Sequence, residues 1–138
     1  MKEISVIVAT MLVCLFAGCK KDSTTSPETG ANANIPVIAN TMNAFALNVT
    51  AQSYSATIEY VLSFSTDSLA CSLTVVGQTL GNGILRVADS TNSTVYADSS
   101  LQSKAAASTQ TGKGIPRKIK VVFNNYTGII SFAMARNK

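Results

Sequence analysis

From about residue 36 onward, apolar and polar side chains alternate along the chain. The clearest run, residues 54–65, has an apolar side chain at every second position: Tyr54, Ala56, Ile58, Tyr60, Leu62 and Phe64. A period of two residues places these side chains on one face of a β-strand, and no helical period fits the run. Residues 45–50 and 69–75 alternate in the same way. The pattern therefore predicts strands that each have one buried face.

The next segment predicts a hairpin. Residues 81–83, Gly-Asn-Gly, are expected to break the chain before it, because such residues tolerate positive φ in tight connections. The polar residues 90–93 would join strands 84–89 and 94–98. Leu85 and Val87 are expected to point inward. Either both faces of this hairpin are covered or a bulge resets its register.

The last third of the chain predicts a long loop and a closing hairpin. Residues 99–114 are mostly polar and contain a cluster of three alanines at 105–107, which predicts a loop with room for one helical turn. Strands 119–123 and 130–134 would be joined by a turn at residues 124–128. About seven short strands with polar turns predict an all-β domain, an antiparallel β-sandwich of immunoglobulin-like or jelly-roll-like shape.

The N-terminus has the features of an export signal. Lys2 precedes an uncharged apolar run at residues 4–17, which is shorter than the about 20 residues needed to span a bilayer. Small residues, Ala17 and Gly18, then precede Cys19. These residues resemble the lipobox of a bacterial lipoprotein precursor, with Phe16 where that motif usually has Leu. The alternatives are an ordinary cleaved secretory signal or an uncleaved anchor in which Cys19 has no role.

The resemblance implies a cellular location and a division of the chain into three segments. A signal peptide, residues 1–18, would be removed, and acyl groups such as palmitate on the Cys19 thiol would hold the protein to a membrane outside the cytoplasm. In a host with two membranes, that place is the outer membrane or the cell surface. Residues 19–35 are poor in apolar side chains and predict a disordered tether. The β-sandwich domain would then occupy residues 36–138.

The composition argues against several kinds of catalysis. The chain has no histidine, so a Ser–His or Cys–His nucleophile cannot be assembled. Cys71 is the only thiol after Cys19, and its place on an apolar face predicts a buried side chain. We expect no catalytic residues, no metal site and no cofactor. A small hydrolase based on carboxylates stays possible if Glu59 converges with an aspartate.

Two groups of residues are candidates for binding. Four cations lie on or beside the last two predicted strands and predict an anion-binding surface: Arg117, Lys118, Lys120 and Arg136. Outward lysines also protect a sheet edge, which is the simpler reading. Tyr96 and Tyr126 lie near predicted turns and are candidate glycan contacts. No aromatic residues interleave the cations, so we expect no nucleic-acid partner.

Together these features predict a noncatalytic module of the cell envelope. The membrane would be one partner, through the lipid on Cys19, and an envelope protein would be the other. A protein-interaction or structural role is the first hypothesis. A glycan- or cell-wall-binding module, with a surface polysaccharide as its partner, is the second.

Overall fold

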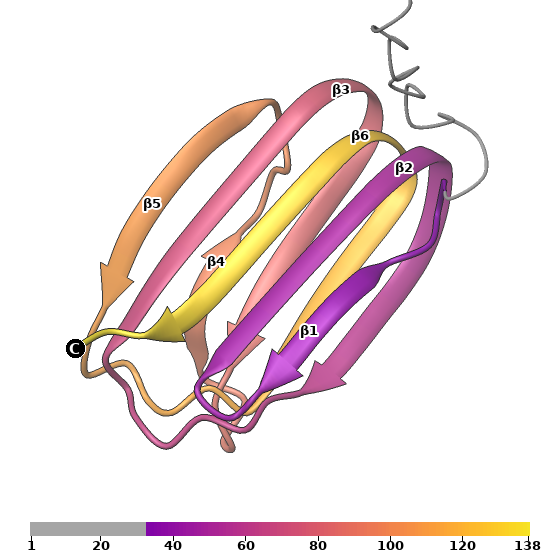
Figure 1. Ribbon diagram of the computed structural model, residues 1–138. Coiled ribbons are helices and arrows are strands. Elements are labelled where there is room, and N and C mark those ends of the chain that lie inside the picture. The colour runs from indigo at the N-terminus through magenta and orange to yellow at the C-terminus, as the bar shows by residue number, and fades with distance from the viewer. Residues whose placement is uncertain (1–32) are drawn as a thin grey trace, which may run out of the picture.

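The computed structural model describes residues 33–138, and this part of the chain is all-β (Figure 1). The predicted leader, Cys19 and most of the predicted tether lie outside the described residues. Six strands follow one another: β1 (Val37–Thr41), β2 (Ala44–Val61), β3 (Leu69–Ala88), β4 (Thr94–Asp98), β5 (Lys104–Gln110) and β6 (Lys118–Arg136). Residues 33–138 contain no helix.

The strands form one antiparallel sheet in the order β1-β2-β6-β3-β4, and β5 also pairs with β3. The last strand of the chain, β6, is the central one. It lies between β2 and β3 along almost its whole length, from Lys118 to Arg136. All pairings are antiparallel, as the sequence predicts.

The three central strands are long and bent. β2, β3 and β6 contain 18, 20 and 19 residues, whereas strands of about 5–6 residues are usual. Their pairing slips between Ala51 and Ala56 in β2 and between Val76 and Asn82 in β3. Bulges of this kind bend a strand and increase its twist. The sheet therefore folds over on itself near its middle (Figure 1).

This bend divides the sheet into two halves. The five-stranded half contains β1, β5 and residues 44–51, 69–76 and 128–136 of the long strands. The four-stranded half contains β4 and residues 54–61, 82–88 and 118–124. The two halves pack face to face, since the rings of Phe45 and Tyr60 are 6.1 Å apart and those of Tyr96 and Phe132 are 5.4 Å apart. Alternate side chains from both halves fill the core between them.

The expected seven-stranded sandwich is not confirmed, because two predicted turns lie inside continuous strands. Residues 81–83 belong to β3, and residues 124–128 belong to β6. Gly81 and Asn125 do adopt positive φ, of 71° and 48°, but they do so at the bend of a strand. Turn-forming residues thus mark bulges here, and fewer, longer strands result.

The prediction of a loop over residues 99–114 is wrong for the middle of this segment. Residues 104–110 form β5, which pairs with residues 69–75 of β3 without a register shift. The three alanines are exposed parts of this strand rather than of a helical turn. Pairing with a neighbouring strand decides the structure here, since β propensity depends strongly on context.

Other predictions are confirmed. Ile58, Leu62 and Phe64 are buried, although β2 ends at Val61. The hairpin of β3 and β4 forms, with Leu85 and Val87 pointing inward, and a bulge after Val87 resets its register. Near the start of the described residues, the Asn34 side chain donates to the C=O of Gln52 and accepts from its N–H.

Candidate interaction surface

The outer face of the five-stranded half consists of small, uncharged side chains. The pairing places them in two rows that cross all five strands: Thr41, Ala44, Ala135, Ala70 and Thr109 in one, and Ala39, Ala46, Ala133, Ser72 and Ala107 in the other. We call these ten residues the small-residue face. All of them are exposed or half-exposed, because their neighbours in sequence supply the core.

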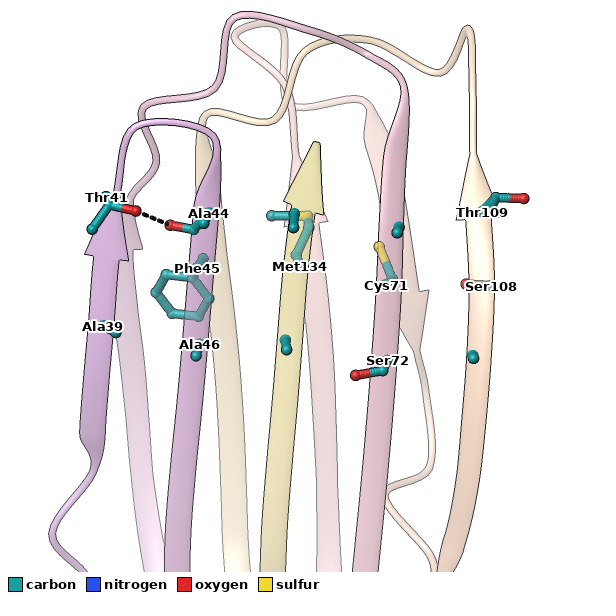
Figure 2. Close-up of a pocket in the computed structure, with 14 residues that line it drawn as sticks. Ala39, Thr41, Ala44, Phe45, Ala46, Cys71, Ser72, Ser108, Thr109 and Met134 are labelled. Atoms are coloured by element: carbon teal, nitrogen blue, oxygen red, sulfur yellow. Dashed lines mark hydrogen bonds between the residues drawn. The ribbon is translucent and has the colours of Figure 1, made fainter. Parts of the chain in front are cut away.

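A shallow trough of about 860 Å³ runs over this face (Figure 2). Its lining contains the ten residues, together with Ser108 and three core residues, Phe45, Cys71 and Met134. No charged side chain lines it, and Thr41, Ser72, Ser108 and Thr109 supply its only side-chain hydroxyls. Toward the bend, a row that contains Asn48, Ser131 and Thr74 is followed by Val76 and Ile129, which are paired and about half exposed.

The outer face of the four-stranded half is charged. Glu59, Lys120 and Arg86 lie opposite one another on three adjacent strands. Lys120 Nζ is 3.1 Å from Glu59 Oε1. Arg86 donates hydrogen bonds to Thr94 Oγ1 and to the carbonyl oxygen of Asn92. The two outer faces of one sheet therefore differ in chemistry, because only one of them carries ion-pairing groups.

The predicted anion-binding residues are only partly brought together. Lys118 and Lys120 line a cavity of about 210 Å³ with Glu59, Arg86, Ala88 and Asn92. Arg117 lies just before β6, where its N–H donates to the carbonyl of Ala88. Arg136 is at the other end of β6, paired with Leu69 in the five-stranded half. The cavity also contains an acid, so an anion there would compete with Glu59 for Lys120.

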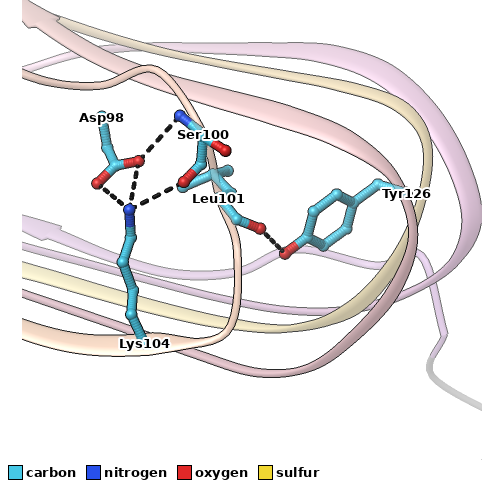
Figure 3. A network of polar contacts seen from close by, with 5 residues as sticks. All are labelled: Asp98, Ser100, Leu101, Lys104 and Tyr126. Atoms are coloured by element: carbon cyan, nitrogen blue, oxygen red, sulfur yellow. Dashed lines mark hydrogen bonds and ion pairs between the residues drawn. The ribbon is translucent and has the colours of Figure 1, made fainter.

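The two predicted glycan contacts point into the protein. Tyr126 is fully buried, and its hydroxyl donates to the carbonyl oxygen of Leu101 at 2.7 Å (Figure 3). The expectation that Tyr126 is displayed is therefore wrong, and burial raises its pKa to about 12. Tyr96 is half-buried against Phe132. Burial, and then the negative charge of Asp98, raise the pKa of Tyr96.

Three of the carboxylates, Glu59, Asp89 and Asp98, have structural partners. Asp89 caps the β3–β4 turn by accepting hydrogen bonds from Thr91 and Ser93, and the Thr91 hydroxyl is the main cause of its lowered pKa. Asp98 Oδ2 lies 2.6 Å from Lys104 Nζ (Figure 3). Glu59 pairs with Lys120. Within residues 33–138, no group of three His, Cys, Asp or Glu side chains is arranged to hold a metal ion.

Cys71 is buried in the core beneath the trough, as its sequence position predicts. Burial raises the pKa of its thiol to about 11. A thiol with so high a pKa is almost entirely protonated near neutral pH, which makes it a weak nucleophile.

Sequence analysis missed the small-residue face. Its signal is the identity of the outward residues in 44–50, 69–76 and 129–135, which are mostly Ala, Ser and Thr where exposed strand positions often have Lys or Glu.

Comparison with known protein families and with curated proteins finds no match. In the described part of the chain, no helix has the length and apolar character needed to cross a bilayer.

Proposed function

We propose that this protein is a lipid-anchored module of the cell envelope whose small-residue face binds a protein partner. The difference between the two outer faces carries the proposal. One face has Glu59, Lys120 and Arg86 in a row, whereas the ten residues of the other face include no charge. Loss of charged side chains is typical of the centre of a protein–protein interface.

The shape of the sheet supports the same role. The two packed halves resemble a sandwich in that each supports the other, so the strands behind the outer face are held in place by a common core. Ala and Ser side chains lose little rotamer freedom when they are covered. A rigid face of short side chains is thus suited to close contact with another flat surface.

A glycan-binding role has less support. Glycan rings usually stack on exposed aromatic side chains, but Tyr126 is buried and Tyr96 packs on Phe132. The small-residue face has no aromatic side chain among its ten members. We therefore place protein binding before polysaccharide binding.

The anchor is tested by fractionation of cells that express the full chain. With Cys19→Ala, lipidation is blocked, so we expect the protein to be either unprocessed or released from the membrane. Cys14→Ala is the matched control and should behave as wild type. A Cys19→Ala protein that loses its leader and still fractionates with the membrane would show that the lipid anchor does not exist.

The binding face is tested by a photo-crosslinking residue introduced into the full chain in native envelopes. At Ala133, in the middle of the small-residue face, we expect a stoichiometric protein adduct of defined mass. At Thr57, which is exposed on the four-stranded half, we expect none. Equal adducts at both positions, or recovery only with polysaccharide, would contradict the proposal.

A further inference from the structure

Within residues 33–138, the five-stranded half ends in an edge strand with one partner. In this part of the chain β5 is paired with β3 on one side only (Figure 1). The outer side of such a strand presents N–H and C=O groups that can pair with another strand. Proteins usually protect edges with charge, proline, bulges or short length.

The other edges in residues 33–138 have such protection. β1 has five residues and follows Pro36. β4 has five residues and ends at Asp98. The free edge of β2 carries Glu59 and begins at the bulge near Ser53. β5 is longer than β1 and β4, with seven residues against five, and it has no charge after Lys104.

The one charge of β5 is held at its start. Lys104 Nζ lies 2.6 Å from Asp98 Oδ2 and donates to the carbonyl oxygen of Ser100 (Figure 3). Residues 105–110 are Ala-Ala-Ala-Ser-Thr-Gln, and the three alanines are exposed. Their short side chains leave the backbone of this edge accessible.

We propose that β5 binds β5 of a second copy of this chain, with the two strands antiparallel about a two-fold axis near Ala107. This inference rests on the proposed function as an interaction module and adds the identity of one partner. The pairing is self-complementary, because it places Lys104 opposite Gln110, Ala105 opposite Thr109 and Ala106 opposite Ser108. Like charges that face each other would oppose cross-strand pairing, and this register contains no such pair.

A second copy fits this edge better than an unrelated strand for another reason. Ala107 and Thr109 belong to the small-residue face as well as to β5. Two five-stranded halves joined at β5 would form one continuous sheet with a small-residue face of twice the width. An isologous pairing also closes on itself and leaves no free β5 edge.

A cysteine scan of β5 in full-length protein in native envelopes tests the pairing. Variants with a single cysteine substitution at each of positions 104–110 are oxidised, and the fraction of disulfide-linked dimer is measured for each variant. A two-fold axis puts only the residue at the axis opposite itself. A residue three positions away would lie about 20 Å from its copy, at about 3.3 Å per residue, which is beyond the reach of a disulfide. We expect dimer formation to peak near Ala107→Cys and to fall on both sides.

The wild-type chain provides the background from Cys14, Cys19 and Cys71, and Ala39→Cys on β1 is the matched control at the opposite edge. A flat profile over β5, or equal dimer from Ala39→Cys, would overturn the inference. A dimer linked between Ala107→Cys and Ala39→Cys copies in a mixture would also overturn it, because it indicates head-to-tail pairing.

A charge substitution gives an independent readout. In detergent-extracted full-length protein, we expect Ala107→Lys to convert dimer to monomer in light scattering, with an unchanged β-sheet spectrum in circular dichroism and a lower melting temperature, because the second copy no longer stabilises the native state. Val37→Lys, at an exposed position of β1 outside the small-residue face, should remain dimeric. If β5 does not crosslink but Ala133 still captures a protein, only this inference fails. If β5 crosslinks and Ala133 captures nothing, the proposed function fails at the small-residue face while the pairing stands.

Discussion

Tyr126 joins the bend of β6 to the loop between β4 and β5. Its buried hydroxyl donates to the carbonyl of Leu101 (Figure 3). The Leu101 N–H donates in turn to the carbonyl of Gly83. The Leu101 side chain is buried against Gly83. One aromatic side chain thus fixes a loop that leads directly into β5.

Removal of this hydroxyl should be costly. In Tyr126→Phe the carbonyl of Leu101 loses its donor in a dry environment, so we expect a loss of about 1–3 kcal/mol in the free energy of unfolding. Urea denaturation measures this change. Tyr60→Phe is the control, since Tyr60 is half-buried and packs on the same core, and we expect a change within about 0.5 kcal/mol. Equal changes in the free energy of unfolding for the two variants would mean that the hydrogen bond to Leu101 does not contribute more to stability than Tyr60 does.

Two buried acids should make stability fall at high pH. Burial raises the pKa of Cys71 from 9.0 to about 11 and that of Tyr126 from 10.0 to about 12. Between pH 9 and 12 the unfolded chain therefore binds fewer protons than the folded one, so the free energy of unfolding decreases as pH rises. Below about pH 8 these two groups contribute almost nothing to the pH dependence.

Urea denaturation at a series of pH values from 8 to 11 measures this decline. Cys71→Ala should be less stable overall but should lose the part of the decline that begins near pH 9. A Cys71→Ala protein with the same slope as wild type would show that the thiol does not titrate with folding.

The bends of β2, β3 and β6 depend on a few residues with positive φ. Gly77 and Gly81 both lie in the bend of β3, with φ of 64° and 71°. A Cβ at Gly81 would lie 2.2 Å from the backbone oxygen of Asn125, whereas one at Gly77 would meet nothing within 4 Å. Substitution at Gly77 therefore measures the energetic cost of positive φ alone, whereas substitution at Gly81 adds the cost of the steric clash with β6.

Alanine substitution at these positions should give different results. Gly77→Ala pays only for the left-handed conformation, so we expect a loss of about 1–2 kcal/mol. Gly81→Ala must also move the β6 backbone, and we expect a larger loss or failure to fold. Thermal unfolding of both variants, followed by circular dichroism, measures the difference. Similar melting temperatures would mean that the β3 and β6 bends are not in tight contact.

The sequence is informative about strands with one buried face but not about how they continue. The alternation at 45–49 and 69–75 predicts the observed burial, because every second residue enters the core. The bends are harder to recognise, since Gly81 and Asn125 suit a turn and a bulge equally. β5 has no alternation at residues 105–107, so only its pairing with β3 defines it.

The candidate site was partly predictable for a similar reason. Lys118 and Lys120 are two residues apart on one strand and share an outer face, as the pattern predicts. The small-residue face depends on register between five strands, which sequence neighbours do not encode. Tyr126 was misplaced because its neighbours have turn-forming composition.

The central position of β6 should dominate the stability of the molecule. β6 has a paired strand on both sides through both halves, whereas β1 and β5 each have one partner. We expect the slowest amide hydrogen exchange at residues 119–123 and 130–134, and faster exchange in β1. Mass spectrometry of exchanged peptides measures this order. Exchange in β6 as fast as in β1 would contradict a single cooperative core. If β5 pairs between copies, its protection should rise with protein concentration.

The central position of β6 in the sheet also affects when the chain can fold during synthesis. The strand that joins β2 to β3 is the last to be made, so a growing chain has the first five strands without the one that connects them. Neither half of the sheet is complete until residues 118–136 are available, and long-range pairing of this kind is slow. On the proposed export route, this topology would delay folding until residues 118–136 have been synthesised, and a chain that folds late remains competent for export for longer.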